Sequence, residues 1–240
     1  MISKEETASN LKDVETRIEG ACVRSGRSRS EVSLIAVSKM NPAEAVINAY
    51  GCGQKIFGEN KVQELCKKQD EVSKAINCED MEWHLIGHLQ TNKVKYVVGR
   101  VKLIHSVDSF KLAETIDKES ARKGLITDIL LEVNIADEES KFGLKPEEVE
   151  ELVRKIAVLK NVRIRGLMTV APYTEDAGTN REFFRKLKDL SVDIGRKNID
   201  NVNMNVLSMG MTGDFEVAIE EGASYIRVGT GIFGARDYSK

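Results

Sequence analysis

Lys39 stands at a position where a lysine side chain could do covalent chemistry. It follows the apolar run 32–37 and is separated from that run only by Ser38. Such a run predicts a buried strand, and lysine is rarely buried or placed in a strand without a reason. A lysine at the carboxyl end of a core strand can lose its proton through desolvation and attack an aldehyde, which gives a Schiff base. The alternative is a solvated lysine that has simply left the strand.

Two segments in the last part of the chain contain residue types that bind anions. Gly229-Thr230-Gly231 follows the apolar run 225–228, and Ser208 with further glycines follows the run 205–207. Glycine lets the backbone come close to a ligand, and the N–H groups at the start of a helix are unpaired. The alternative is that these glycines only permit tight turns. Because both segments follow neighbouring runs, together they favour a phosphate site.

Arg227 lies inside the last apolar run of the sequence. Its guanidinium stays protonated there, so it must find an acceptor or an aromatic face. An internal ion pair, for example with Glu132 or Asp214, is the alternative to a ligand. A ligand that is both an aldehyde and a phosphate ester fits the lysine, the glycine segments and the arginine together. Pyridoxal 5′-phosphate is one such ligand, and a phosphosugar handled by a Schiff-base aldolase is another.

Other common kinds of site find little support in the sequence. His84 and His88 have the spacing of a metal pair on a helix, but residues 85–87 favour a strand and a turn. No glutamate follows His84 as in the zinc-protease motif, and the chain has only 3 histidines. The 4 cysteines form no Cys-x-x-Cys pair. There is also no Gly-x-Ser-x-Gly motif and no Walker loop, so we predict no metal site.

The elements that must position these residues alternate along the chain. The predicted strands are 33–37, 55–57, 82–86, 103–106, 129–134, 162–167, 205–207 and 225–228. The predicted helices are 4–24, 42–50, 61–75, 109–122, 146–159, 175–195 and 214–220. Repeated βα units predict an α/β fold, a (β/α)8 TIM barrel with an extra N-terminal helix; a doubly wound open sheet is the rival. No Gly-x-Gly-x-x-Gly follows the first strand, which weakens the dinucleotide-binding form of that rival.

Composition and charge narrow the class of partner. The 240 residues contain no linker-like stretch, so we predict a single domain over residues 1–240. The formal net charge of −2 provides no basic field for nucleic acid, and we interpret the cluster of Arg24, Arg27 and Arg29 as a solvated loop. The first residues lack the apolar stretch of a signal peptide, and no run of about 18 apolar residues occurs. We therefore expect a cytoplasmic protein with no membrane partner.

Several ordered segments of the sequence resemble those of a known family. They are AVSK (36–39), FGEN (57–60), WHLIGHLQTNK (83–93), KFG (141–143), RGLM (165–168), LSMGM (207–211) and RVGT (227–230). Together they resemble the pyridoxal phosphate homeostasis proteins, which are similar to the N-terminal domain of alanine racemase. The segments are long and span nearly the whole chain, so the resemblance is far more specific than a single glycine loop.

The resemblance implies a barrel of pyridoxal phosphate fold type III and a set of cofactor-binding residues. It implies that Lys39 holds the cofactor as a Schiff base and that Arg227 faces the pyridine nitrogen. The other residues that it implies are Ser208, Gly229 and Thr230 at the phosphate, Met209 and Gly231 with backbone groups there, and Asn60, His84 and Met168 around the ring. The sequence shows no departure from the family pattern at these positions.

The resemblance also implies a non-catalytic carrier or buffer that holds pyridoxal phosphate and releases it to apo-enzymes. Arg227 beside the pyridine nitrogen would keep that nitrogen unprotonated and the ring a weak electron sink. The alternative is a small amino-acid racemase of the same fold. Such racemases need a second base, a tyrosine from an extra domain, and none of the 5 tyrosines is a clear candidate. We also expect no such domain after the eighth βα unit, and a monomer, because a closed barrel has no edge strands.

Overall fold

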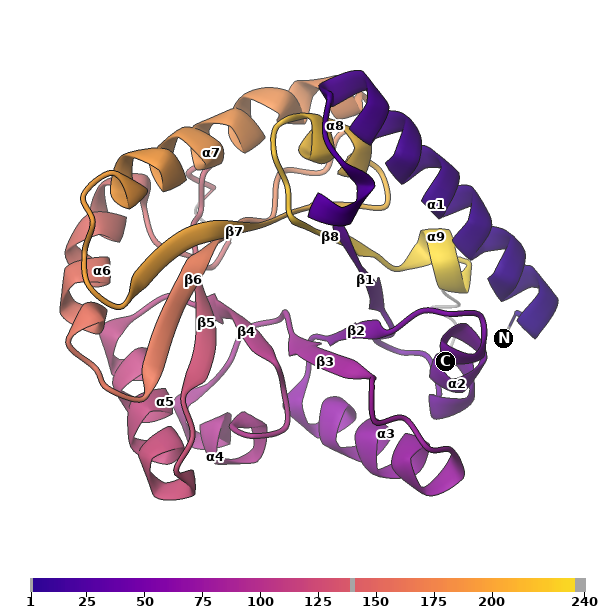
Figure 1. Ribbon diagram of the computed structural model, residues 1–240, viewed down its shortest axis with the longest axis horizontal. Coiled ribbons are helices and arrows are strands. Elements are labelled where there is room, and N and C mark those ends of the chain that lie inside the picture. The colour runs from indigo at the N-terminus through magenta and orange to yellow at the C-terminus, as the bar shows by residue number, and fades with distance from the viewer. Residues whose placement is uncertain (1, 139–140, 236–240) are drawn as a thin grey trace.

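The computed structural model describes residues 2–138 and 141–235, and its strands form a closed parallel barrel (Figure 1). The strands are β1 (Ser33–Val37), β2 (Ile56–Glu59), β3 (Glu82–Leu85), β4 (Leu103–Val107), β5 (Thr127–Glu132), β6 (Val162–Met168), β7 (Val202–Met211) and β8 (Tyr225–Val228). Each pairs with the next, and β1 pairs with β8, which closes the ring. The predicted TIM barrel is confirmed, and the open sheet is excluded. Residues 1 and 236–240 of the predicted single domain, with Tyr238, lie outside the described residues.

Helices surround the barrel (Figure 1). They are α1 (Lys4–Ser25), α2 (Ala43–Gly51), α3 (Val62–Ala75), α4 (Val94–Val97), α5 (Phe110–Lys123), α6 (Val149–Ala157), α7 (Arg181–Gly195), α8 (Phe215–Glu220) and α9 (Thr230–Phe233). Helices α2–α8 lie between consecutive strands, α1 precedes β1 and α9 follows β8. The predicted helices 146–159 and 175–195 each contain a 3-10 turn before the α-helix, at Pro146–Glu148 and Ala177–Asn180. No helix in this described part of the chain is long and apolar enough to cross a membrane.

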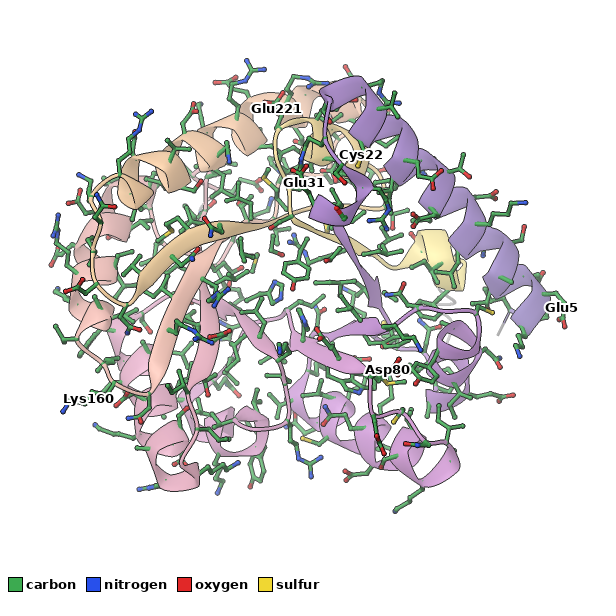
Figure 2. The ribbon with its side chains drawn as sticks, in the orientation of Figure 1. Glu5, Cys22, Glu31, Asp80, Lys160 and Glu221 are labelled. Carbon is green, nitrogen blue, oxygen red and sulfur yellow. The ribbon has the colours of Figure 1, made fainter. Side chains whose placement is uncertain are left out.

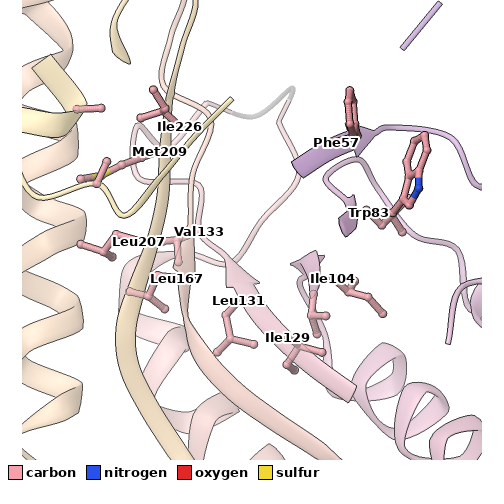
Figure 3. Close-up of a cluster of buried hydrophobic side chains, with 14 of the residues drawn as sticks. Phe57, Trp83, Ile104, Ile129, Leu131, Val133, Leu167, Leu207, Met209 and Ile226 are labelled. Carbon is pink, nitrogen blue, oxygen red and sulfur yellow. The ribbon is translucent and has the colours of Figure 1, made fainter. Parts of the chain in front are cut away.

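The main hydrophobic core lies in the layer between strands and helices. Ile129 and Leu131 of β5 point into this layer (Figure 3). Leu130 between them points the other way, because successive strand side chains alternate between the two faces. It joins Leu103 and Met168 in a smaller cluster inside the barrel. This alternation decides which residues reach the barrel interior and hence which can reach a site at its mouth.

Strand β7 is much longer than the predicted strand 205–207. Residues 202–205 are polar or half-exposed, so their apolar pattern is weak, yet β6 pairs with β7 from Ile164↔Val202 to Met168↔Ser208. The two strands approach closely at Gly166, whose φ is +152°. A Cβ atom on Gly166 would lie 1.8 Å from the carbonyl oxygen of Val206. Only glycine fits this crossing.

The N-terminal helix α1 packs across the barrel exterior against α8, α9 and α2 (Figure 1). The α1 residues Val14 and Ile18 are buried against the barrel, and Asn10 Nδ2 of the same helix donates to the carbonyl of Ile232 at 3.0 Å. Interpreting the arginine cluster after α1 as a solvated loop was wrong for Arg27. Its side chain is only 16% exposed and donates to the carbonyl of Ile219 in α8 and to that of Ala223 in the segment between α8 and β8, each at 2.8 Å. The cluster therefore helps to fix α1 to the barrel.

Charged side chains point outward from the helices, as Glu5 on α1 and Glu221 after α8 show (Figure 2). Glu221 accepts hydrogen bonds from Arg181 and Arg185 of α7, and Arg24 of α1 reaches Glu220 at the end of α8. These exposed pairs cross between helices and orient them, but such pairs contribute little free energy individually. The charged helix face predicted for 175–195 is thus partly used for contacts within the chain.

Candidate functional site

A cavity of about 640 Å³ opens at the carboxyl ends of the strands. In a TIM barrel this end carries the chemistry. Five of the residues singled out in the sequence line the cavity, namely Lys39, Asn60, Arg227, Gly229 and Thr230. They come from β1, β2 and β8 or the loops just after them, so barrel closure brings the first and last strands to one site. The structure thus places the predicted amine, guanidinium and glycine segment together.

A buried ion pair behind β1 fixes the backbone that carries Lys39. Ser38 Oγ donates to Glu59 Oε1 at 2.6 Å, and Lys68 Nζ of α3 donates to the carbonyl of Ser38 at 2.8 Å. Lys68 also donates to Glu59, which is fully buried. Burial raises the pKa of the Glu59 carboxyl, and the charge and hydrogen bond of Lys68 oppose that rise. The segment Ser38–Lys39 is therefore held from its outer side while Lys39 faces the cavity.

Thr212 is a cavity residue that the sequence analysis did not single out. Its Oγ1 accepts a hydrogen bond from the backbone N–H of Gly229 and one from the hydroxyl of Thr230, both at 3.3 Å. It therefore joins the segment after β7 to the segment after β8. Asp214 holds the same turn, because it accepts from the N–H of Met211 at 2.6 Å and from Asn180 Nδ2 at 2.8 Å. These loops thus bring the hydroxyl groups of Thr212 and Thr230 and the backbone of Gly229 to the cavity wall.

Arg227 lies on the cavity wall with only 4% of its surface exposed. Its Nη1 donates to Ser208 Oγ at 2.6 Å, and its Nη2 donates to the carbonyl of Thr169 at 2.8 Å. Burial lowers the pKa of Arg227 to about 10, and the charges of Asp214 and Glu132 act in the opposite direction. The guanidinium remains protonated at neutral pH and is aimed by hydrogen bonds rather than by a direct ion pair.

Three other predicted residues lie one level below the cavity wall. His84, Met168 and Ser208 are fully buried inside the barrel and do not line the cavity. Successive strand side chains alternate between two faces, which explains the positions of His84 and Met168. Ile86 and Val170, two residues further along the sequence, line the cavity. Their predicted contacts with a ligand stay predictions.

The two residues predicted to act through backbone groups also occupy different surroundings. The side chain of Met209 belongs to the outer core between the strands and helices, and it points away from the barrel interior. Gly231 lies in α9, next to the cavity residue Thr230. The side chain of Met209 therefore has no access to the cavity, and only its backbone could take part.

Glu132 is a buried acid inside the barrel that the sequence analysis considered only as a partner of Arg227. It is 9% exposed, and its Oε2 atom has no hydrogen-bond partner among the described residues. Burial, strengthened by the charge of Asp108, raises the pKa of Glu132 to about 7, although Arg227 opposes the rise. Glu132 therefore titrates close to neutral pH.

We expect the unfolding free energy of the protein, relative to a Glu132→Gln variant, to fall between pH 5 and pH 8. A carboxyl with a raised folded-state pKa contributes stability fully below the ordinary value of 4.5, and this is lost as the pH rises through about 7. The loss corresponds to about 3 kcal/mol. Urea unfolding of both proteins at the two pH values measures it, and a constant difference between them would contradict the assignment.

Comparison with known proteins identifies the family. Residues 17–237 match the family model described as the N-terminal domain of alanine racemase. The curated pyridoxal phosphate homeostasis protein of Aquifex aeolicus is 46% identical over 228 residues, which are 95% of this chain and 97% of that protein. This chain belongs to the pyridoxal phosphate homeostasis protein family. The Escherichia coli family member is 37% identical over 234 residues, covering 97% of this chain and 98% of its own.

Solved structures agree with this membership. PipY of Synechococcus elongatus, a structure described as having PLP (pyridoxal phosphate) bound, superposes with a TM-score of 0.81 at 36% identity, over 95% of this chain and 100% of its own. A protein from Bifidobacterium adolescentis gives a TM-score of 0.90 at 34% identity over 97% and 98% of the two chains. Alanine racemase of Clostridium difficile is 11% identical with a TM-score of 0.72; this chain covers 58% of it, so it shows the shared fold alone.

In the described part of this family member, no group of three or more His, Cys, Asp or Glu side chains could hold a metal ion. The sequence analysis did not single out three features of the structure: Thr212 at the cavity, the buried pair of Glu59 and Lys68, and His105, which lies buried beside Ser208. Thr212 comes shortly after the predicted strand 205–207, so it could have been considered as a binding residue together with the nearby glycines. Nothing in the sequence pairs Glu59 with Lys68, or His105 with residues far along the chain.

Proposed function

We propose that this protein binds pyridoxal 5′-phosphate in the cavity, attached to Lys39 as a Schiff base, and acts in intracellular pyridoxal phosphate homeostasis as a carrier or buffer. The observation that carries the proposal is the meeting of Lys39, Arg227 and the donors of Thr212, Gly229 and Thr230 at one cavity. In the attachment the Lys39 amine adds to the aldehyde and one water leaves. The name of the curated relatives and the PipY structure support the same ligand.

The residues present fit this ligand. The hydroxyls and backbone N–H groups of the loops after β7 and β8 suit a phosphate dianion, and Ser208 lies beneath them. The Oδ1 atom of Asn60, a residue of the cavity wall, is buried and has no hydrogen-bond partner within residues 2–138 and 141–235, which suits a polar substituent of the ring. Bound pyridoxal phosphate supplies an aldehyde that condenses reversibly with amines and a ring that can withdraw electrons.

The charge of Arg227 favours binding without turnover. A guanidinium can only donate hydrogen bonds, so it requires a lone pair on the pyridine nitrogen that it faces. Two adjacent cations repel, so Arg227 keeps that nitrogen unprotonated and limits carbanion stabilisation. The amino-acid racemase is the alternative that uses the same cofactor. Tyr173 lies at the cavity but is 94% exposed, so its hydroxyl is not held in place as a second proton carrier.

The visible absorption spectrum tests the proposal. We expect the purified protein, after addition of pyridoxal phosphate and dialysis, to show a Schiff-base band that borohydride removes, leaving a pyridoxyl group on the Lys39 peptide in mass spectrometry. A protein that takes up no pyridoxal phosphate would contradict the proposal and favour a Schiff-base aldolase, whose substrate sugar would then be trapped on Lys39. The loaded protein should not exchange the Cα proton of alanine in D2O; exchange would establish the racemase.

Delivery to partners belongs to the same proposal. A Schiff base on Lys39 is reversible, so an apo-enzyme with a more favourable lysine can take the cofactor. The cytoplasm, where such enzymes are made, is the proposed location, and the closed barrel is consistent with the predicted monomer. Size-exclusion chromatography with light scattering distinguishes the monomer from an oligomer.

A further inference from the structure

A chain of buried polar side chains runs through the barrel beneath the cavity. His105 of β4 lies between His84 of β3 and Ser208 of β7. The His84 Nδ1 and His105 Nε2 atoms are 2.9 Å apart, and His105 Nδ1 is 2.9 Å from Ser208 Oγ. Ser208 in turn receives the hydrogen bond of Arg227. The three inner residues are fully buried, so water does not compete for these bonds.

The chemistry of the end group fixes the direction of every hydrogen bond in this chain. Arg227 can only donate, so Ser208 Oγ accepts from it. The single hydroxyl proton of Ser208 then goes to His105 Nδ1, the remaining acceptor that Ser208 reaches among the described residues. A neutral His105 therefore carries its proton on Nε2 and donates it to His84 Nδ1.

The end of the hydrogen-bonded series at His84 supports the same direction. His84, having accepted at Nδ1, carries its own proton on Nε2. This atom is 3.8 Å from Glu82 Oε2, too far for a hydrogen bond but near enough for attraction between the N–H and the carboxylate. The reverse direction would turn a bare nitrogen lone pair toward the carboxylate. It would also leave the Ser208 proton without an acceptor.

Both histidines are neutral at physiological pH. Burial lowers the pKa of His105 well below its ordinary value, and the neighbouring His84, when protonated, and Arg227 act in the same direction. Burial also lowers the pKa of His84, although Glu82 opposes this. The ring of Tyr225 packs edge-on against both imidazoles, with centroid distances of 5.2 and 5.9 Å. Both the geometry and the protonation of these hydrogen-bonded side chains are thus fixed.

We propose that His105 is a positioning residue for Arg227: through Ser208 it anchors the guanidinium so that the remaining N–H groups of Arg227 face the ring nitrogen of bound pyridoxal phosphate. This inference rests on the proposed function. Asp214 and Glu132 are the acids whose charges act on Arg227. Without the anchor, of the two hydrogen bonds of the guanidinium only the one to the Thr169 carbonyl keeps its geometry, and the guanidinium can turn about it toward either acid and away from the ring. An imidazole suits the role because its two nitrogens accept at one end and donate at the other.

The protonation pattern can be tested without any cofactor. We expect two-dimensional ¹⁵N–¹H spectra of the ¹⁵N-histidine-labelled apo-protein at pH 7 to show His105 and His84 both neutral with the proton on Nε2. The half-exposed His88 provides an internal reference signal from an imidazole outside the hydrogen-bonded series. A proton on Nδ1 of His105, or a His105 that carries protons on both ring nitrogens at pH 7, would overturn the proposed series of hydrogen bonds.

The effect on the cofactor is tested with matched variants. His105→Phe keeps a ring but removes both hydrogen bonds, and we expect about tenfold weaker binding of pyridoxal phosphate and a shifted absorption band. His105→Asn places an acceptor near the position of Nδ1 and should restore most of the affinity and the band. His88→Phe is the control and should change neither.

These outcomes separate the inference from the proposed function. If His105→Phe folds and binds with unchanged affinity and spectrum, His105 does not position Arg227. If His105→Phe does not fold, the tautomers of the unmutated apo-protein decide. If the unmutated protein binds no pyridoxal phosphate, the proposed function fails and the positioning role fails with it, whereas the hydrogen-bonded chain is still judged by the apo spectra.

Discussion

A Lys39→Ala variant is expected to lose the Schiff-base absorption band and to bind pyridoxal phosphate at least about 100-fold more weakly than the unmutated protein. The covalent bond to the cofactor is lost, whereas Arg227 and the loops after β7 and β8 still provide non-covalent contacts. Binding should therefore be weakened and not abolished. Equilibrium dialysis measures the affinity, and absorption spectra before and after borohydride report the bond.

The control for this variant is Lys61→Ala. Lys61 is exposed and precedes α3, two residues after the end of β2, so it lies at the same end of the barrel. Its removal should leave both affinity and spectrum unchanged. Should Lys39→Ala bind with the affinity and spectrum of the unmutated protein, the attachment to Lys39 would be wrong, although binding in the cavity could still be correct.

A Gly166→Ala variant is expected to lose about 4 kcal/mol or more of unfolding free energy, or to fail to fold. The added Cβ would lie 1.8 Å from the carbonyl oxygen and 2.7 Å from the carbonyl carbon of Val206. Both atoms belong to the backbone of β7, so relief requires the two strands to separate. The φ of +152° adds strain for any residue other than glycine. Urea unfolding followed by circular dichroism measures the change.

The matched control for the second variant is Gly20→Ala in α1. A Cβ at Gly20 meets only the flexible end of the Arg24 side chain, at 3.4 Å. Alanine is favoured over glycine inside a helix by about 1 kcal/mol, so this variant should be slightly more stable. A Gly166→Ala protein as stable as the unmutated one would show that β6 and β7 do not approach as closely as described.

The sequence predicted most of the barrel because its strands are buried on both faces. Such strands are nearly continuous apolar runs, as at β1 and β8, whose predicted bounds agree with the structure. Strand β7 was predicted too short at both ends: its first residues are polar and only partly buried, and Ser208 and Gly210, which were predicted to follow the strand, lie within it. The short α4 was missed because four residues show no helical period.

The site could be predicted only where local sequence carries the signal. Lys39, Arg227 and the Gly229–Thr230 pair stand out because a charge or a glycine follows or interrupts an apolar run. His105 could not be recognised in this way, because its partners Ser208 and His84 become neighbours only when the barrel closes. Near the strand ends, successive side chains alternate between facing the cavity and lying beneath it. A predicted strand end that is wrong by one residue therefore assigns a side chain to the wrong face.

The pairing of β1 with β8 joins the two ends of the chain, with Ile35 opposite Arg227 in register. Lys39 is made early in translation, but Arg227, Gly229 and Thr230 leave the ribosome among the last residues. A nascent chain therefore has the lysine proposed to attack the aldehyde long before it has the residues proposed to contact the phosphate and the ring. High-affinity binding must await the final strand, and any ligand that binds only the closed ring stabilises that ring against opening at its first and last strands. Such a ligand thus stabilises the pairing of β1 with β8, which completes the barrel.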